Sequence, residues 1–473
     1  MARYIVPIAL LGTLSATSAS AAPGTLFGHD VLEVEPLTAE ETQQRRESFE
    51  TMLEDKGWAQ IDDQVLPVDA GGRFAQPPVP PQLGAQPPHR ATIFLNFFGQ
   101  EDLSPGTNSA ENESNCLQQV MDWPGFGGGN AQALALIDVF EINMEPYGVR
   151  IAYDERPPSH LPYAMVMMGG TPDLIGLGGG VLGVSCSPDC ADMWWRDTTF
   201  AFTGAINLNN AEVLGTTALH EAAHAFGLAH IDNPQRIMNP FVGGGTVTWA
   251  DECTPYNDAT GGINCQATHA SYCDGNPAQN TNAELMAYFG ANSPDIVAPT
   301  VELTMPTEDQ IEVEVGESFM IEVEVSDDHE GYGWRLVVPE LEQEIPVFNN
   351  QKSWELSFPE GVYTVRVEAI DHDRNEGSDE VTVFVGVPAG DTGLDETGDG
   401  GSADGEGTSG ATSAGEDSDG GDGTGNEGDG TGNDDGSGQN EASDGGCRVG
   451  GNNPTPPMWL LLGLLPFALR RRD

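Results

Sequence analysis

Eleven residues decide how this chain is interpreted: HEAAHAFGLAH, residues 220–230. His220 and His224 are four positions apart, so in a helix their imidazoles lie on one face, one turn apart, as a shared metal ion requires. Gly227 can adopt the left-handed conformation that ends a helix, which lets the chain turn and His230 supply a third nitrogen. Three neutral imidazoles leave one position of a tetrahedral ion open, which is the pattern of catalytic zinc sites.

Glu221 follows the first of these histidines and is close enough to reach a water molecule at the metal without displacing it. The short HExxH core alone is a weak signal, and a helix that merely carries these histidines is the alternative. Gly227 and His230 make that alternative much less favourable. Histidine is also scarce, since three of the nine in the chain fall within these eleven residues.

A methionine follows the third histidine by eight residues, in Ile237-Met238-Asn239-Pro240. The eleven-residue motif and this methionine together resemble the metzincin clan of zinc endopeptidases, and the Met-x-Pro form is most similar to the matrixins. The resemblance implies an α/β (α+β) metzincin-like catalytic domain with zinc held by His220, His224 and His230. It also implies a tight Met-turn at Met238 beneath the metal.

Three departures limit the resemblance to the clan. Ile231 after the third histidine matches none of the common subfamily markers, and no tyrosine stands two residues after Met238. Residues 22–115 contain no cysteine, so the cysteine-switch segment of the matrixins is missing. The subfamily is therefore not assigned.

The chemistry of the motif leads to a prediction of function. Zinc would activate a water molecule and polarise the scissile carbonyl, and Glu221 would act as the general base. We therefore expect a monomeric zinc endopeptidase that acts on proteins or peptides. The alternative is a catalytically inactive, zinc-containing surface adhesion protein that binds through a second domain, and the intact Glu221 argues against it.

Residues 91–295 are predicted to form the catalytic domain. Strands are expected at residues 91–98, 149–153, 163–168 and 205–208, and an amphipathic helix at residues 131–144. Asn210 is a candidate cap of the helix that carries the metal ligands. The edge strand that pairs with an extended substrate in metzincins is expected between residues 180 and 185.

Residues 296–387 contain seven short segments, most of which alternate apolar and polar residues, separated by Gly, Asp, Asn and Pro clusters. They predict an antiparallel β-sandwich similar to bacterial immunoglobulin-like domains, which serves as a spacer or binds a partner. The acidic cluster at residues 371–375 is interpreted as a turn, because Glu376 stands where an EF-hand loop needs glycine. Structural calcium stays an additional cofactor candidate beside zinc.

Six of the seven cysteines lie between Cys116 and Cys273. An even number in an exported chain predicts three disulfides, with the pairing left open. A second metal site built from these cysteines is the rival interpretation. Cys447 stands apart, in the C-terminal tail.

Both ends of the chain indicate export. Residues 1–21 resemble a signal peptide, and residues 22–90 form a pro-segment or accessory arm, with a capping box at Thr38 and Glu41 and a helix over residues 39–56. Inhibition of the enzyme by this arm until the arm is removed is a third hypothesis.

The C-terminal part continues with an acidic stalk, residues 388–446, which holds 16 acidic and no basic residues and too few apolar ones to fold. The tail, residues 447–473, combines Cys447, an apolar run and three arginines, and it resembles the sorting tails of myxobacterial surface proteins. It is expected to contact the membrane at least transiently, with a plain hydrophobic anchor as the alternative. The protein would be extracellular or anchored at the outer membrane.

The overall charge excludes one class of function. The chain has 74 acidic and 18 basic residues and a net charge of -56. A surface this negative is repelled by phosphate backbones, so no nucleic-acid partner is expected.

Overall fold

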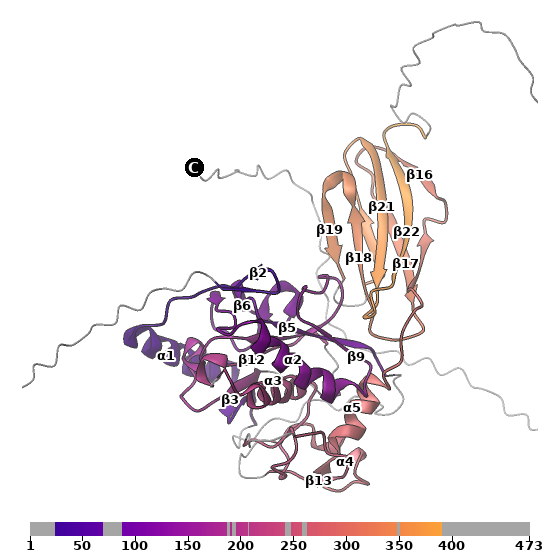
Figure 1. Cartoon of the computed structure of the whole chain (residues 1–473). Helices are drawn as coiled ribbons and strands as arrows, with labels where there is room; N and C mark the ends of the chain where they lie inside the picture. The colour runs from indigo at the N-terminus through magenta and orange to yellow at the C-terminus, as the bar shows by residue number, and fades with distance from the viewer. Residues whose placement is uncertain are drawn as a thin grey trace, which may run out of the picture. The chain divides into compact units, whose positions relative to one another are not determined.

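A computed structural model describes residues 24–69, 88–186, 190–191, 195–206, 208–241, 247–257, 263–347 and 351–389 (Figure 1). These residues belong to one compact unit that ends at Gly390. The expected signal peptide, most of the acidic stalk and the C-terminal tail lie outside the described residues. Within the described residues, no helix has both the length and the apolar character needed to cross a bilayer.

A mixed seven-stranded sheet forms the centre of the first part of the chain, with the strand order β3-β4-β11-β12-β10-β5-β9. Its strands are β3 (Trp58–Ile61), β4 (Gln64–Pro67), β5 (Ala91–Asn96), β9 (Val149–Ala152), β10 (Ala164–Met168), β11 (Gly183–Cys186) and β12 (Thr198–Ala201). Strands β9, β5, β10 and β12 run parallel, β11 runs antiparallel to β12, and β4 runs parallel to β11. Expected strands at residues 91–98, 149–153 and 163–168 are matched by β5, β9 and β10.

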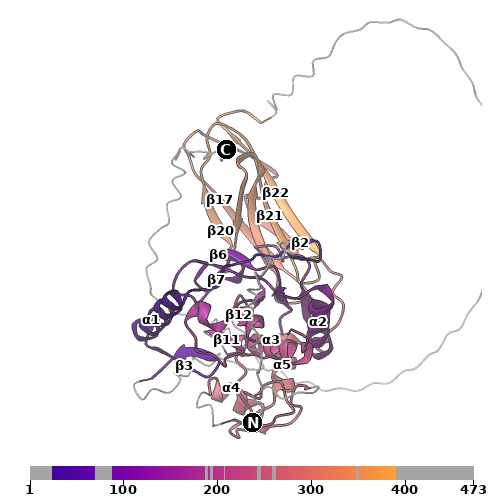
Figure 2. The ribbon, with the colours of Figure 1, turned by 60° about the vertical axis from the view of Figure 1, so that its left-hand side comes forward.

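The sheet separates two hydrophobic cores. Along β10, Val166 and Met168 point into one core, while Met165 and Met167 point into the other. Because both faces of the strand are covered, its sequence is a continuous apolar run rather than an alternating one. Helices α2 (Asn130–Met144) and α3 (Ala211–Ala225) cover the first face, and α1 (Ala39–Lys56) contributes to the second (Figure 2).

Two of the predicted helices are present within one residue of the expected bounds. Helix α1 spans the predicted residues 39–56, and its N-cap Thr38 forms the reciprocal capping box with Glu41. Helix α2 begins one residue before the predicted 131–144 segment.

The prediction of a strand at residues 205–208 is wrong. Ala205 ends a short 3-10 helix (Thr203–Ala205), and the strand of this region is β12, at Thr198–Ala201. All four residues of β12 are buried, so the strand shows no alternation that would distinguish it in the sequence.

Smaller elements connect the main ones and fill the edges of this part. They are β1 (Thr25–Leu26), β2 (His29–Asp30), β6 (Gln100–Pro105), β7 (Glu113–Ser114), β8 (Met121–Trp123), β13 (Thr254–Pro255), β14 (Ala278–Gln279), α4 (Gln266–Ser271) and α5 (Thr281–Phe289).

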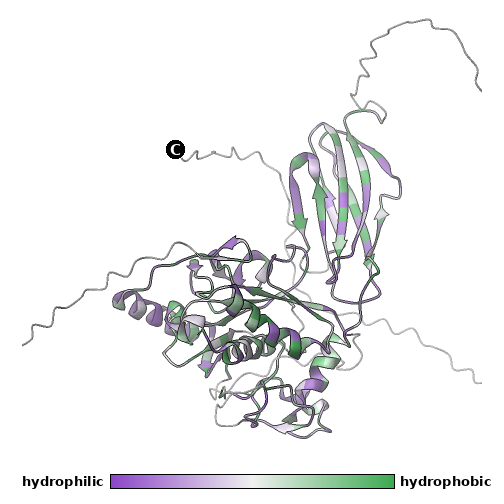
Figure 3. Ribbon diagram, viewed as in Figure 1, coloured by the Kyte–Doolittle hydropathy of each residue, from purple (hydrophilic) through white to green (hydrophobic). Residues whose placement is uncertain are grey.

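The second part runs from Thr300 to Val385, and its described residues contain only strands and one short 3-10 helix (Pro339–Leu341). One sheet contains β15 (Thr300–Met305), β17 (Phe319–Ser326) and β20 (Ser353–Leu356); the other contains β16 (Gln310–Val313), β22 (Glu376–Val385), β21 (Gly361–Ile370), β18 (Gly333–Val338) and β19 (Gln343–Pro346). Residues of both sheets share one core, and hydropathy alternates along the strands (Figure 3). This is the sandwich architecture expected from the alternating segments.

One strand pair departs from the antiparallel prediction. Strand β16 pairs parallel with β22, because the chain crosses from the three-stranded sheet to the five-stranded sheet after β15. Strand β19 was not among the seven predicted segments. The predicted turn at residues 371–375 is present between β21 and β22.

Hydrogen bonds join the sandwich to the start of β5. The Arg90 amide donates to the Glu330 carbonyl at 2.7 Å, and the Thr92 hydroxyl lies 2.8 Å from His372 Nδ1. Arg150 on β9 donates to the carbonyl of His372 at 3.3 Å. Thr92 and His372 are both buried.

Candidate metal centre

Helix α3 carries the first two histidines of the motif into the interior. Asn210 caps the helix, as predicted, by accepting a hydrogen bond from the Val213 amide at 3.2 Å. Every residue from Leu214 to Ala225 is buried. Gly215 allows the close approach of α2, since a β-carbon there would lie 2.7 Å from Val139 Cβ. The helix is therefore held firmly between α2 and the sheet.

The third histidine is brought back by a reversal of the chain. Gly227 has a φ of 90°, the left-handed conformation that the sequence predicted at this position. The Ile231 amide then donates to the Met238 carbonyl at 2.9 Å, which ties the chain beyond His230 to the expected Met-turn segment. Met238 is fully buried in the main core, within a turn closed by a hydrogen bond between Asn239 and Arg236.

The structure brings the three predicted imidazoles together. His230 Nε2 lies 3.1 Å from His220 Nε2 and 3.0 Å from His224 Nε2. The other ring nitrogen of His220 lies 2.7 Å from the Ile237 carbonyl, and that of His224 lies 2.7 Å from the Leu228 carbonyl. A carbonyl only accepts, so Nδ1 of His220 and of His224 carries a proton, and Nε2 of each ring in its neutral form presents a lone pair.

Neutral imidazoles whose Nε2 lone pairs faced each other at this distance would repel, and a cation between them would remove the repulsion. Burial lowers the pKa of His224 to about 4, so its ring is neutral near neutral pH, as a metal ligand must be. Burial acts to lower the pKa of His220 as well, but the contact of this ring with the Asp63 carboxylate outweighs burial, and the pKa is raised. The donor set therefore fits a metal ion on its own chemistry.

A fourth donor, Asp63, completes the group and was not part of the sequence prediction. Its carboxylate oxygens lie 3.2 Å from His220 Nε2, 3.5 Å from His224 Nε2 and 3.1 Å from His230 Nε2. Ligands of a tetrahedral zinc ion lie about 3.3 Å apart when each is about 2.0–2.1 Å from the metal. Three imidazoles and one carboxylate at these separations match a tetrahedral zinc site better than the oxygen-rich sites of calcium or magnesium.

Glu221 lies beside this group and is buried, with 1% of its surface exposed. Its Oε2 atom has no hydrogen-bond partner among the described residues. Burial raises the pKa of this carboxyl well above its usual range, and the charges of Asp63 and Asp62 raise it further. Glu221 therefore binds a proton more readily than an exposed glutamate does.

A cleft of about 250 Å³ opens next to these residues. One wall is β11, and other walls come from α3 and the segment after Met238. Strand β11 lies where the edge strand was expected, but it is not an edge strand, because β4 pairs with its outer side. Its lining includes Asp63, Gly183, Thr217, Glu221, Asn239 and Phe241. Phe241 is 65% exposed, although it is a large apolar side chain. The side chain is thus free to contact a ligand at the mouth of the cleft.

Gly183 on β11 determines how much space Glu221 has. A β-carbon at this position would lie 2.5 Å from both Cγ and Oε1 of Glu221, which is too close. We expect Gly183→Ala to displace the Glu221 carboxylate and to lower any hydrolytic rate at least about tenfold, within the range expected for a misplaced general base. Zinc content, measured by mass spectrometry, should not change.

Gly179→Ala is the matched control, because a β-carbon there meets no atom within 4 Å. It should behave as the wild type. An active Gly183→Ala protein with the wild-type rate would show that the position of Glu221 does not limit hydrolysis.

All six cysteines in the described residues form disulfides. The pairs are Cys116–Cys186, Cys190–Cys265 and Cys253–Cys273. The prediction of three disulfides is confirmed, and the rival second metal site built from cysteines is excluded. The disulfides indicate an exported protein.

Two further groups of side chains could hold a cation. Asp295, Asp327 and Asp371 place one oxygen each within 4.8 Å of one another, and Asp295 also lies near Asp328 and His329. Burial raises the pKa of Asp327 to about 6, and the neighbouring carboxylates Asp295, Asp371 and Asp328 add to this effect. The carboxylate of Asp371 accepts hydrogen bonds from Asn375, as the predicted turn requires.

Comparisons with known proteins do not identify a family. No protein-family model and no curated protein matches the chain. Among solved structures, fibronectin(III)-like modules of Clostridium thermocellum CbhA share 25% identity over 19% of this chain and 47% of theirs, with a TM-score of 0.16. The extracellular domain of a hybrid two-component system from B. thetaiotaomicron shares 18% over 19% of this chain and 15% of its own, also at 0.16.

A modular endo-β-1,4-mannanase from Cellulomonas fimi shares 13% identity over 54% of this chain and 58% of its own, with a TM-score of 0.14. The chain thus spans less than two thirds of each of these structures. At these TM-scores the similarity identifies neither a fold family nor a function.

Proposed function

We propose that the protein is an exported, zinc-dependent endopeptidase of the metzincin type that hydrolyses peptide bonds of proteins. One observation carries this proposal. Three imidazole Nε2 atoms converge, two of the rings are oriented by backbone carbonyls, and the buried Glu221, whose Oε2 has no hydrogen-bond partner among the described residues, lies beside them. A purely structural zinc site has no need of such a carboxylate.

When bound, zinc would supply a Lewis acid that polarises a substrate carbonyl and lowers the pKa of a water molecule. His220, His224 and His230 would hold the ion. Glu221 would accept the proton from the attacking water and deliver it to the leaving amine. Strand β11 would pair through its backbone with an extended substrate, so that binding depends little on the substrate sequence.

The proposal is tested with the full chain, before and after limited digestion by a serine protease that is then inhibited. We expect one equivalent of zinc per chain and cleavage of casein that o-phenanthroline stops and added zinc restores. Zinc removal should abolish activity, because every step of hydrolysis depends on the polarised carbonyl. Mass spectrometry and gel analysis of the casein fragments provide the measurement.

A folded, zinc-loaded chain that cleaves neither casein nor gelatin, in the intact or the digested form, would contradict the proposal. That result would favour the alternative, an inactive surface protein that binds through its β-sandwich.

A further inference from the structure

The fourth donor at the metal centre comes from the N-terminal arm, far from the histidines in sequence. Strands β3 and β4 form a hairpin in which Ile61 pairs with Gln64, so Asp62 and Asp63 are its two turn residues. Asp62 takes a left-handed φ of 59°, as tight hairpin turns require. The turn places the Asp63 side chain among the three imidazoles.

The same hairpin covers the strand that would bind a substrate. Strand β4 pairs parallel with β11, with Gln64 opposite Ser185 and Val65 opposite Cys186. The Ser185 amide donates to the Asp63 carbonyl at 3.0 Å. Without the hairpin, β11 would be an edge strand with free backbone groups, which is what an extended peptide needs for pairing.

The arm contacts the histidines through a side chain and not through a peptide group. The carbonyl of Asp63 is engaged with Ser185, while its carboxylate oxygens lie 3.1–3.5 Å from the nitrogens. The hairpin therefore occupies the place beside the three imidazoles where a substrate carbonyl would bind, and it presents no peptide bond that could be hydrolysed there.

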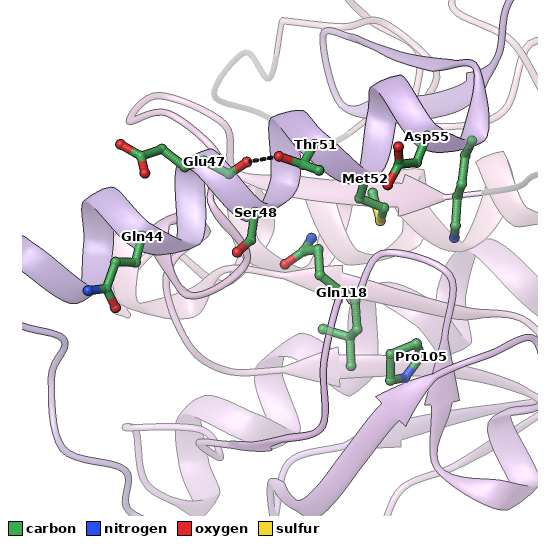
Figure 4. Close-up of a pocket in the computed structure, with 10 residues that line it drawn as sticks. Gln44, Glu47, Ser48, Thr51, Met52, Asp55, Pro105 and Gln118 are labelled. Atoms are coloured by element: carbon green, nitrogen blue, oxygen red, sulfur yellow. Dashed lines mark hydrogen bonds between the residues drawn. The ribbon is translucent and has the colours of Figure 1, made fainter.

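The arm and β11 are held in different ways. Cys186 at the end of β11 is bonded to Cys116, so this strand is covalently fixed. Residues 22–115 contain no cysteine, and the arm is held by non-covalent contacts alone. Helix α1 buries only Phe49 and Met52, and an open groove of about 780 Å³ runs along its side (Figure 4). Departure of the arm would therefore break no disulfide and would leave β11 tied to Cys116.

We propose that Asp63 is the fourth ligand of the metal ion in the unprocessed chain, and that the β3–β4 hairpin keeps the enzyme latent by occupying both the metal and β11. This inference rests on the proposed peptidase function for its biological meaning. The ligand assignment itself can be tested without any measurement of activity.

The test compares the full chain with its Asp63→Asn variant, loaded either with cobalt or with zinc. Asn keeps the shape of the turn residue but removes the charged ligand. We expect an altered visible spectrum of the cobalt protein and zinc loss to a chelator that is about tenfold faster or more, within the range known for perturbed metal sites. Casein cleavage should appear without prior digestion.

Asp62→Asn is the matched control, because it removes the same charge one residue away and Asn tolerates the left-handed conformation. It should retain the wild-type spectrum and chelation rate. Removal of the arm from the wild-type chain by limited proteolysis should reproduce the spectral change. This second measurement keeps the test valid if the Asp63→Asn variant does not fold.

The outcomes separate the two proposals. An Asp63→Asn protein with the wild-type cobalt spectrum and chelation rate overturns the ligand assignment. Altered metal properties without casein cleavage in any form support the assignment and contradict the peptidase function. Casein cleavage by the intact wild-type chain at the rate of the processed chain overturns latency.

Discussion

Replacing Glu221 by Gln is expected to reduce peptide hydrolysis about a hundredfold or more, because the amide cannot accept the proton of the attacking water. The side chain keeps its size and its buried place next to Gly183. Zinc should stay bound, since Glu221 is not among the converging donors. The measurement is kcat/KM on a fluorogenic peptide with the processed chain, together with zinc content.

Glu212→Gln is the control, because Glu212 is an exposed carboxylate at the start of the same helix. Its kcat/KM should equal that of the wild type. A Glu221→Gln protein that retains both its zinc and the wild-type rate would show that another group accepts the proton.

Replacing His224 by Gln is expected to abolish tight zinc binding, because it removes one of three nitrogen ligands from a fully buried position. A metal present at a thousand times its dissociation constant stabilises the folded state by about 4 kcal/mol. We therefore expect EDTA to lower the unfolding free energy of the wild type by about that amount and to leave the variant unchanged. Urea unfolding with and without EDTA measures both.

Each protein is compared with itself, so a loss of packing in the variant does not affect the interpretation. His29→Gln serves as the control, since His29 is exposed on β2. A His224→Gln protein that keeps stoichiometric zinc and its sensitivity to EDTA would remove His224 from the metal centre.

The local parts of the site could be predicted from the sequence. The spacing of His220 and His224, the cap at Asn210 and the left-handed Gly227 each depend on a few neighbouring residues, and short-range geometry determines them. The position of the third histidine could also be predicted, because only three residues separate the reversal at Gly227 from the end of the motif and their backbone has few possible conformations. Likewise, apolar and polar residues alternate along the sandwich strands because one face of each strand is buried.

The non-local parts could not be predicted in the same way. Asp63 reaches the histidines only because β4 pairs with β11, more than a hundred residues later in the chain. The two aspartates between two short strand-like segments are a hairpin signal, but nothing in them specifies the partner strand. The parallel pairing of β16 with β22 also depends on the sheet that the chain enters after β15. The alternation of apolar and polar residues does not specify that sheet.

The contacts between the sandwich and β5 bear on how the protein unfolds. Arg90 and Thr92 mark the start of a strand in the central sheet, and their partners, Glu330 and His372, belong to the sandwich. A chain cut after residue 295 would leave the Arg90 amide without its acceptor and the Thr92 hydroxyl without its imidazole. Since unpaired polar groups in buried positions are costly, both parts should melt in one cooperative transition rather than as independent modules.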